Sequence, residues 1–402
     1  MTDSNLPPSA ALYSSTQNQS GKFKSFGYGL EPMKKLKIVH IVEALGGGVY
    51  TYFTDLTHVS GDLPNVETTI IYSDKRTQID PGHVAEDFHK DMRLIKIAMV
   101  RNISLKQDYL TYKQLKSLIK DLEPDIIHLH SSKASILGRL AHFFSKSNAL
   151  LYYTPHAYAF LRHDISMPKR KFYFVIEKLV QKLFGGKTIA CGDTEYDYAR
   201  KIGSAGLIRN GIDIKYVEDH KEKVKNDILT VGTLGRITHN KNPFLFNELA
   251  LRHPDIKFLW IGDGELRHLL TAPNIEVTGW FKVREVGIYK LNEVDIYLQT
   301  SVLEGLPMAL LEAMVLEKPI IATNVIGNKD VVDHKKTGFL FDSKEEFDNY
   351  LEILKVEAKR KEFGKNGHTR CYSLFNSEKN FKQLIDLYWS DYLKKKNLET
   401  AN

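Results

Sequence analysis

The amino-acid sequence predicts an α/β protein made of two doubly wound, Rossmann-like domains. The chain has 402 residues, which is too long for one hydrophobic core. Short apolar runs alternate with helical patterns through both halves, as in parallel sheets that carry helices on both faces. A turn signal near the middle, Asn210-Gly211-Ile212-Asp213, interrupts this alternation, which then restarts. We therefore expect two domains that join near residues 203–215.

The first half begins with a strand that leads into a glycine-rich loop. Residues 37–44 form a buried type of strand, and Gly46, Gly47 and Gly48 follow it before a helical pattern starts. A strand, a glycine turn and a helix can together cradle a phosphate or a sugar. Because the G-x-G-x-x-G spacing is absent, a plain tight turn is an equally good interpretation.

The rest of the first half continues the alternation of strands and helices. We expect its other strands at residues 67–72, 125–130, 150–154 and 187–191, with a prominent helix at residues 104–122. His156 follows directly after one of these strands, at the carboxyl end where such sheets bind ligands. A lone histidine is more commonly structural, so His156 is only a candidate on this evidence.

Residues 168–184 form an amphipathic helix pattern. Phe172, Val175, Leu179 and other apolar residues follow the helical period, and five Lys and Arg side chains supply the polar side. The first interpretation is a helix packed on its own sheet, and contact with a lipid surface is the second.

The second half repeats the strand–helix order and ends in helices. Strands are expected at residues 228–234, 257–262, 275–279, 295–299 and 319–323. From residue 344 onward the chain is helical and charged, with a break near residues 373–376.

The stretch 298–314 is the centre of the predicted site. It runs from a strand through a turn at Gly305 into a helix, with Pro307 near the first helical position. The free N–H groups at such a helix start attract anions. Glu304 and Glu312 lie beside them, and a carboxylate there suits a ligand with hydroxyl donors, such as ribose or a hexose.

A basic loop follows the first strand of the second half. Arg236 and Lys241 lie in it, and two cations at the end of a strand can clamp a diphosphate. The alternative is a pair of solvated surface charges. Gly262-Asp263-Gly264 forms a second glycine turn after a strand, which can equally be only a turn.

Composition and charge narrow the class of protein. The chain is 43% hydrophobic and 26% charged, and no apolar run reaches the roughly 18 residues that span a bilayer. Residues 1–33 are expected to be a flexible tail, and Cys191 and Cys371 form no metal or redox spacing, which fits a reducing cytosol. The net charge of +7 lies within residues 34–205, which hold 25 Lys and Arg against 18 Asp and Glu. An anionic membrane surface is the preferred explanation, since no nucleic-acid motif accompanies the charge.

Taken together, these motifs resemble glycosyltransferase family 4, which has the GT-B fold. The resemblance covers about residues 36–345 and rests on six motifs in the right order. They are Gly46-Gly47-Gly48, Asn210-Gly211-Ile212-Asp213, Gly235-Arg236 with Lys241, Gly262-Asp263-Gly264, Glu304-x7-Glu312, and Gly327-Asn328 before Thr337-Gly338-Phe339-Leu340.

The resemblance implies a cleft between the two domains and a role for each site residue. The catalytic set would be Arg236 and Lys241 on the donor diphosphate, Glu304 near the donor sugar, and His156 reaching across the cleft to that sugar. Glu312 would bind the ribose. The other donor-binding residues would be Gly235, Gly264, Gly305, Leu306, Pro307, Trp280 and Phe281, the last two near the base, and the loop Gly46, Gly47 and Gly48 would face acceptor and phosphates.

The implied domains are an acceptor-side domain at residues 34–207, a nucleotide-sugar domain at 208–372, and a terminal helix at 373–402 that returns to the first domain. The implied reaction is a retaining transfer of a hexose-type sugar from a nucleoside diphosphate sugar, UDP-sugar favoured. The acceptor would be lipid-linked or a saccharide in bacterial surface polysaccharide synthesis. We expect a cytoplasmic protein, with the inner membrane face as a further location. We expect no metal or other cofactor, since the cations can stabilise the leaving diphosphate and no Asp-x-Asp triplet occurs.

Other functions fit the sequence less well. A GT-B-type nucleotide-sugar epimerase would need a further acid/base set in the first domain, and none can be assigned. A catalytically silent partner subunit need not keep Arg236, Lys241, Glu304 and Glu312 together. A glycoside hydrolase is disfavoured because the two glutamates are better explained by hydroxyl binding. No nucleic-acid partner is expected, because aromatic residues do not interleave the basic ones.

Overall fold

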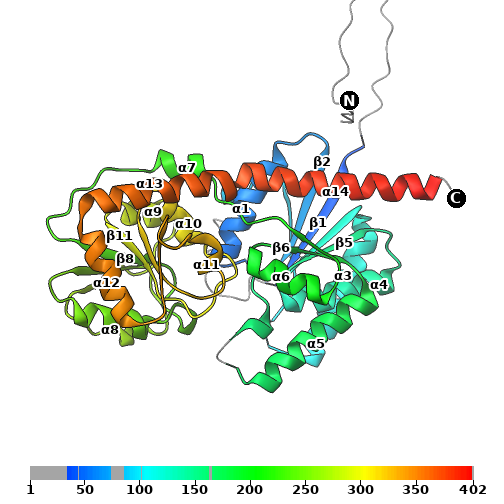
Figure 1. Cartoon of the computed structure of the whole chain (residues 1–402). Coiled ribbons are helices and arrows are strands. Elements are labelled where there is room, and N and C mark those ends of the chain that lie inside the picture. Colours follow the sequence, from blue (N-terminus) through cyan, green and yellow to red (C-terminus); the bar gives the residue numbers. More distant parts are fainter. Residues whose placement is uncertain (1–33, 44, 74–85, 101, 163–164, 401–402) are drawn as a thin grey trace, which may run out of the picture. The chain divides into compact units, whose positions relative to one another are not determined.

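The computed structural model describes residues 34–43, 45–73, 86–100, 102–162 and 165–400. The tail expected at residues 1–33 lies outside them. Lys35–Asn402 form one compact unit that contains two parallel β-sheets (Figure 1). None of the helices described combines the length and the apolar character that a membrane crossing requires.

The first sheet has seven strands in the order β3-β2-β1-β4-β5-β6-β7, and adjacent strands run parallel. The inner strands are mostly apolar runs, because both faces of such a sheet are covered. Their bounds are β1 (Leu36–Val42), β2 (Val66–Tyr72), β3 (Arg93–Lys96), β4 (Ile126–His130), β5 (Leu150–Thr154), β6 (Lys187–Ala190) and β7 (Ala205–Leu207).

Helices connect these strands and cover the sheet. They are α1 (Gly48–Gly61), α3 (Leu105–Leu122), α4 (Ser132–Ser145), α5 (Met167–Phe184) and α6 (Asp193–Ile202), with a short 3-10 turn η1 (Ala159–Leu161). The helix expected at residues 168–184 is therefore present as α5. Its first interpretation was wrong in part, because Gln181 is its one buried residue and Phe172, Val175, Leu179 and Leu183 are half or more exposed.

The second sheet has six parallel strands in the order β10-β9-β8-β11-β12-β13. Their bounds are β8 (Thr230–Leu234), β9 (Lys257–Ile261), β10 (Ile275–Val277), β11 (Ile296–Gln299), β12 (Ile320–Thr323) and β13 (Gly338–Phe341). The connecting elements are α7 (Ile214–Asp219), η2 (His239–Lys241), α8 (Pro243–Arg252), η3 (Arg267–Leu269), α9 (Arg284–Asn292), α10 (Met308–Val315) and α11 (Asn328–Val331).

Three helices end the described chain: α12 (Lys344–Lys355), α13 (Glu357–Leu374) and α14 (Ser377–Thr400). The break expected near residues 373–376 is present, and Val356 makes a second one. α14 packs on the first sheet's side of the molecule, because Phe381, Leu384 and Tyr388 share one hydrophobic cluster with Leu36 of β1 (Figure 1).

Both sheets change direction at one point in their strand order. In the first, the chain builds outward from β1 to β3 and then returns to place β4 on the other side of β1. The second sheet does the same at β8 and β11. Ligands of open parallel sheets bind beyond the carboxyl ends of the strands at such a switch point. The loops after β1, β4, β8 and β11 are thus where a site is expected.

Candidate active site

Lys241 and Glu304 meet beyond the carboxyl ends of two neighbouring strands. Lys241 ends the short turn after β8, and Glu304 follows β11. Nζ of Lys241 lies 2.8 Å from Oε1 of Glu304, and the side chains are only 19% and 14% exposed. The structure therefore brings two of the predicted catalytic residues together as an ion pair at the switch point of the second sheet.

Two further donors fix the Glu304 carboxylate. The Ser301 hydroxyl donates to Oε1 of Glu304 at 2.7 Å, and Nε2 of Gln299 donates to the same atom at 3.1 Å. The Tyr297 hydroxyl donates to Oε1 of Gln299 at 2.9 Å, which sets the amide orientation. The contacts from Lys241, Ser301 and Gln299 are all made to Oε1, and a network of this kind holds a carboxylate in one position.

The loop after β8 passes close under Lys241 at Gly235. Gly235 has φ +147°, a conformation that L side chains rarely adopt, and an added Cβ would lie 3.2 Å from Cε of Lys241. Nε1 of the buried Trp260 donates to the carbonyl of Gly235 at 2.8 Å. Glycine at this position lets the backbone approach the cation.

Arg236 lies on the same loop, and this loop packs against the second glycine turn, Gly262-Asp263-Gly264. Its Nη2 lies 3.0 Å from Oε2 of Glu265. The N–H of Ile237 donates to the carbonyl of Asp263 at 2.8 Å, and a Cβ on Gly264 would lie 2.3 Å from the carbonyl oxygen of Ile237. The predicted donor-binding residue Gly264 therefore lets one loop pack on the loop that carries Arg236.

Glu312 is buried in α10 and is paired with Arg284. Nε of Arg284 donates to Oε1 of Glu312 at 3.0 Å, and its Nη1 donates to Oδ1 of Asp55 in α1 at 3.0 Å. The N–H of Asp213 donates to the other oxygen of Asp55 at 2.8 Å. One guanidinium thus joins a helix of the first sheet to the carboxylate that was expected to bind ribose.

Burial and the ion pairs together set the pKa values of Arg284 and Asp55. Burial disfavours the charged guanidinium, but the carboxylates of Asp55 and Glu312 outweigh it and raise the pKa of Arg284. Burial raises the pKa of Asp55, and the charge of Arg284 opposes that shift. Nη2 of Arg284 is buried and has no hydrogen-bond partner among the described residues.

His156 lies against the turn that precedes α10. His156 and Ala157 have positive φ angles of +52° and +85°, which is strained backbone for residues with a side chain. A Cβ on Gly305 would lie 2.9 Å from the carbonyl carbon of His156. Oε1 of the buried Glu195 accepts from the N–H of Ala157 at 2.9 Å and holds the loop in place. The predicted residues His156 and Gly305 are therefore neighbours.

The turn that precedes α10 is close to its expected form. α10 begins at Met308, so Pro307 is the N-cap residue and Leu306 is buried before it. Gly46 and Gly47 precede α1, and a Cβ on Gly48 would lie 3.1 Å from Cγ of Met308. The glycine loop after β1 therefore reaches the start of α10.

Trp280 and Phe281, which were expected near the base, differ in how far their rings are exposed. They lie in the loop between β10 and α9, where Trp280 is 61% exposed. Phe281 packs against the second sheet's core and fills the space that a Cβ on Gly287 would need. Only the Trp280 ring is thus open for stacking on a ligand.

Three further histidines, His40, His128 and His130, lie behind the His156 loop. Nδ1 of His130 lies 3.0 Å from Nε2 of His156, and Nε2 of His130 lies 3.0 Å from Nδ1 of His40. The ring nitrogens of His40, His128 and His130 come within 4.8 Å of one another, a spacing that could hold a metal ion. Hydrogen bonds already engage both ring nitrogens of His128 and His130 and Nδ1 of His40; the partners are histidine rings and the hydroxyls of Thr154 and Tyr388.

Sequence reasoning missed several residues of this region. Asp55 and Arg284 carry no local motif, since the two residues that pair with each other lie 229 positions apart along the chain. His130 did carry a signal, because it alternates with His128 along a buried strand, where polar residues are uncommon.

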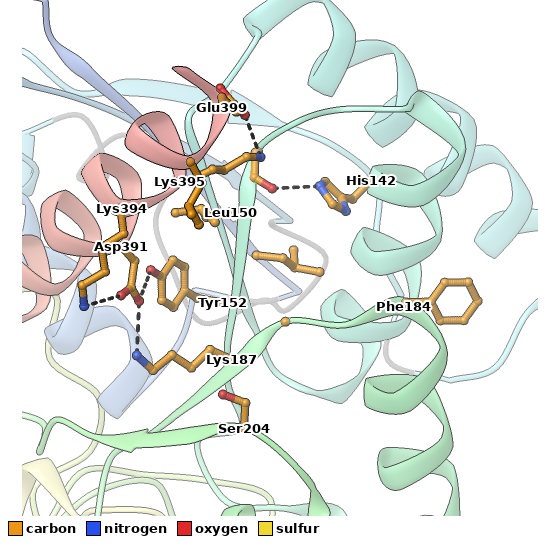
Figure 2. Close-up of a pocket in the computed structure, with 14 residues that line it drawn as sticks. His142, Leu150, Tyr152, Phe184, Lys187, Ser204, Asp391, Lys394, Lys395 and Glu399 are labelled. Carbon is orange, nitrogen blue, oxygen red and sulfur yellow. Dashed lines mark hydrogen bonds and ion pairs between the residues drawn. The ribbon is translucent and has the colours of Figure 1, made fainter. Parts of the chain in front are cut away.

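A cavity of about 730 Å³ lies elsewhere, beside α14 (Figure 2). Its lining includes Leu150 and Lys187, the first residues of β5 and β6, and thus the amino ends of those strands. Asp391 there accepts from the Tyr152 hydroxyl at 2.9 Å and from Nζ of Lys187 at 3.2 Å. The cavity is therefore not part of the candidate active site, which lies at the carboxyl ends.

Two family models match the chain in succession. The model described as Glycosyltransferase Family 4 matches residues 47–216, and the model described as Glycosyl transferases group 1 matches residues 216–370. The first match includes Gly47, Gly48, His128, His130 and His156, and the second includes Arg236, Lys241, Glu304 and Glu312.

Similar proteins include two bacterial enzymes. The UDP-Gal:alpha-D-GlcNAc-diphosphoundecaprenol alpha-1,3-galactosyltransferase of Escherichia coli is 29% identical over 326 residues, which are 72% of this chain and 81% of the relative. The capsular polysaccharide biosynthesis glycosyltransferase CapM of Staphylococcus aureus is 23% identical over 399 residues, 89% of this chain and 97% of the relative.

A solved structure has the same fold. The sucrose-phosphate synthase of Thermosynechococcus elongatus superposes with a TM-score of 0.75 at 17% identity, over 90% of this chain and all of the other. Two Rossmann-like parallel sheets, a family 4 model followed by a group 1 model, and these relatives agree. The chain belongs to the family 4 glycosyltransferases of the GT-B fold and is a glycosyltransferase.

Proposed function

We propose that this enzyme transfers a hexose-type sugar from a UDP-sugar to a lipid-linked saccharide acceptor during surface polysaccharide synthesis, with retention of anomeric configuration. The observation that carries the proposal is the Lys241–Glu304 pair at the switch point of the second sheet. A cation and a hydroxyl acceptor held together there suit a sugar joined to a diphosphate.

The proposed chemistry divides between the two parts of the donor. Breaking the glycosyl–phosphate bond builds negative charge on the leaving diphosphate, and Arg236, Lys241 and the N-terminus of α10 would stabilise it. Glu304 would accept hydrogen bonds from the sugar hydroxyls, and His156 would contact the sugar from the side of the first sheet.

Glu312 would bind the ribose, and Trp280 would stack on the base. Because Arg284 now occupies Oε1 of Glu312, ribose hydroxyls would share or replace that contact. Nη2 of Arg284, which has no hydrogen-bond partner in the part of the chain that the structure describes, offers a buried donor nearby for a ligand oxygen.

The relatives support the choice of substrates. The Escherichia coli relative uses UDP-galactose and a diphosphoundecaprenol-linked sugar by its name, and the Staphylococcus aureus relative takes part in capsular polysaccharide synthesis. A sugar nucleotide donor and a lipid-linked acceptor follow for this chain by analogy with them.

The donor can be identified by calorimetric binding of UDP-, GDP- and ADP-sugars to the wild type and to Glu312→Ala. We expect UDP-sugars alone to bind, with affinity reduced at least tenfold in the variant. The matched control is Glu276→Ala. It removes a glutamate of the edge strand β10 that pairs with Lys257 of β9 in the second sheet. Tight binding of GDP- or ADP-sugars instead would refute the UDP assignment.

The stereochemistry is tested on the product. Incubation of the enzyme with a UDP-α-hexose and a soluble acceptor carrying a lipid diphosphate should give an α-linked product, read from the anomeric proton coupling by NMR. A β-linked product would exclude retention.

We also propose that the enzyme works at the inner face of the cell membrane. Support comes from α5, where Phe172, Val175, Leu179 and Leu183 form an exposed apolar stripe at helical spacing. The exposed Lys171, Lys178 and Lys182 belong to the same helix, and the exposed Phe143 of α4 packs on Phe184 at its end. An apolar stripe bordered by lysines suits an anionic lipid surface.

Co-sedimentation with vesicles tests this contact. We expect binding to vesicles that contain phosphatidylglycerol, weaker binding to phosphatidylcholine, and loss of binding in Phe172→Ser/Leu179→Ser. The control is Phe244→Ser/Leu251→Ser, which changes two equally exposed apolar residues of α8. Equal binding by both double variants would rule out α5 as the membrane contact.

A further inference from the structure

Three histidine rings form one continuous chain of hydrogen bonds that ends at the candidate active site. His40 of β1 and His130 of β4 are buried, and His156 is half-buried at the loop beside Gly305. The two links of the chain, from His156 to His130 and from His130 to His40, are each 3.0 Å long. Both nitrogens of His130 are used within the chain.

A neutral imidazole has one N–H donor and one acceptor nitrogen. Each link needs a donor on one side and an acceptor on the other, so the donors along the chain must all point the same way. When the donors point from His156 towards His40, all three rings carry their protons on Nε2. In the other direction all three carry them on Nδ1.

The surroundings keep the rings neutral, which makes this rule strict. Burial lowers the pKa of His40 to about 3 and that of His156 to about 4, and burial also lowers the pKa of His130 well below its ordinary value. Phe53 of α1 packs edge-on against both His40 and His130 and has no hydrogen-bonding group of its own.

We propose that His130 and His40 are positioning residues that set the tautomer of His156, and with it whether Nδ1 of His156 offers an N–H or a lone pair. This inference rests on the proposed contact of His156 with the donor sugar. A sugar hydroxyl can donate or accept, so a fixed Nδ1 selects one orientation of that hydroxyl. A ring free to change tautomer would lose that selection in the transition state.

His128 provides a matched comparison within the same strand. It is as buried as His130 and lies two residues away, but its ring nitrogens face the Tyr388 hydroxyl and the Thr154 hydroxyl, the latter at 2.9 Å. It therefore lies outside the chain that leads to His156. Its replacement should affect folding stability without affecting His156.

The first test uses the wild-type enzyme labelled with 15N-histidine. Long-range 1H–15N spectra report which ring nitrogen carries the proton. We expect His40, His130 and His156 to be neutral and to share one tautomer. Different tautomers among the three, or a metal ion bound stoichiometrically to the purified protein at these rings, would overturn the proposal.

The second test measures kcat and the donor KM in His130→Phe and His40→Phe. We expect kcat to fall about tenfold or more with the donor KM changed less than threefold, and mixed tautomers at His156. His40→Asn, which keeps a polar group near the position of Nδ1, should recover most of the kcat lost in His40→Phe. His128→Phe should lower the Tm and leave kcat and the His156 tautomer unchanged.

His156→Ala separates this inference from the function on which it rests. If His156→Ala keeps wild-type kcat, the proposed contact between His156 and the sugar is wrong. If His156→Ala loses kcat while both phenylalanine variants keep it, the contact stands and the positioning role is wrong.

Discussion

Arg284 and Asp55 form an ion pair, 3.0 Å from Nη1 to Oδ1, that joins a helix following β10 of the second sheet to a helix of the first. The same guanidinium reaches Glu312 at 3.0 Å. Asp55 is 3% exposed, so its charge depends on this partner and on the N–H of Asp213.

Arg284→Met should destabilise the protein by about 3 kcal/mol or more, because it leaves the Asp55 carboxylate buried without its counter-charge. Adding Asp55→Asn should restore at least half of the loss, since the variant then has no unpaired charge at position 55. Urea unfolding of the wild type, Arg284→Met, Asp55→Asn and the double variant measures these changes. Purely additive losses would mean that the two residues are not coupled.

Lys241→Ala should lower kcat at least a hundredfold, because it removes a cation that we propose stabilises the leaving diphosphate. Its effect on stability should be modest, since Ser301 and Gln299 continue to hold Glu304. Steady-state kinetics and thermal unfolding are compared with those of Lys290→Ala, which removes a lysine paired with Glu293 on the surface. Comparable losses of activity and stability would argue against a catalytic role.

Gly305→Ala should reduce activity strongly while the protein stays folded. The new Cβ would lie 2.9 Å from the carbonyl carbon of His156 and 3.0 Å from the N–H nitrogen of Ala157, so the loop must move away from the turn. Gly206→Ala is the control, because the nearest atom to its Cβ is at an ordinary 3.5 Å. Unchanged kcat in Gly305→Ala would show that the placement of His156 against this turn is unimportant.

Stability should depend on pH through His40. The pKa of His40 is about 3 in the folded protein and 6.5 when unfolded. Between these values the unfolded chain binds the extra proton, so stability falls as the pH drops below 6.5. Between pH 7 and pH 5 the wild type should lose about 2 kcal/mol more than His40→Asn.

Urea unfolding at several pH values measures this difference. The buried carboxyls of Glu177 and Glu195 have raised pKa values and act in the opposite direction, but both proteins contain them and the comparison cancels their effect. Parallel stability curves for the two proteins would refute the assignment to His40.

The long apolar runs of the sequence predicted most strands to within one or two residues. β3, β7 and β13 were not anticipated. Arg93–Lys96 carries a charge at each end, Ala205–Leu207 is only three residues long, and Gly338–Phe341 is a run of four residues that begins with glycine. Edge strands of this kind receive their structure from a neighbouring strand and leave little pattern of their own. The break at Val356 was missed because the flanking residues on both sides are good helix formers.

The residues of the candidate site also fall into two sets, those that the sequence could locate and those that it could not. Arg236, Lys241 and Glu304 could be proposed from the sequence because each follows a strand at a recognisable turn, and Glu312 because it lies in the helix that begins after Glu304. Their partners could not be predicted, because Arg284 pairs with Asp55 and His130 with His40 only after distant strands and helices have packed. Pairing over such separations depends on the register of the folded sheets, which no local pattern records.

The position of α14 has a consequence for synthesis on the ribosome. Phe381, Leu384 and Tyr388 complete a hydrophobic cluster that contains Leu36 and Ile70 of the first sheet. The nascent first sheet therefore keeps this apolar surface uncovered until the whole second sheet has been translated, an interval on the order of ten seconds at ordinary elongation rates. A chaperone that shields β1 and β2 during that interval would improve the yield of native enzyme.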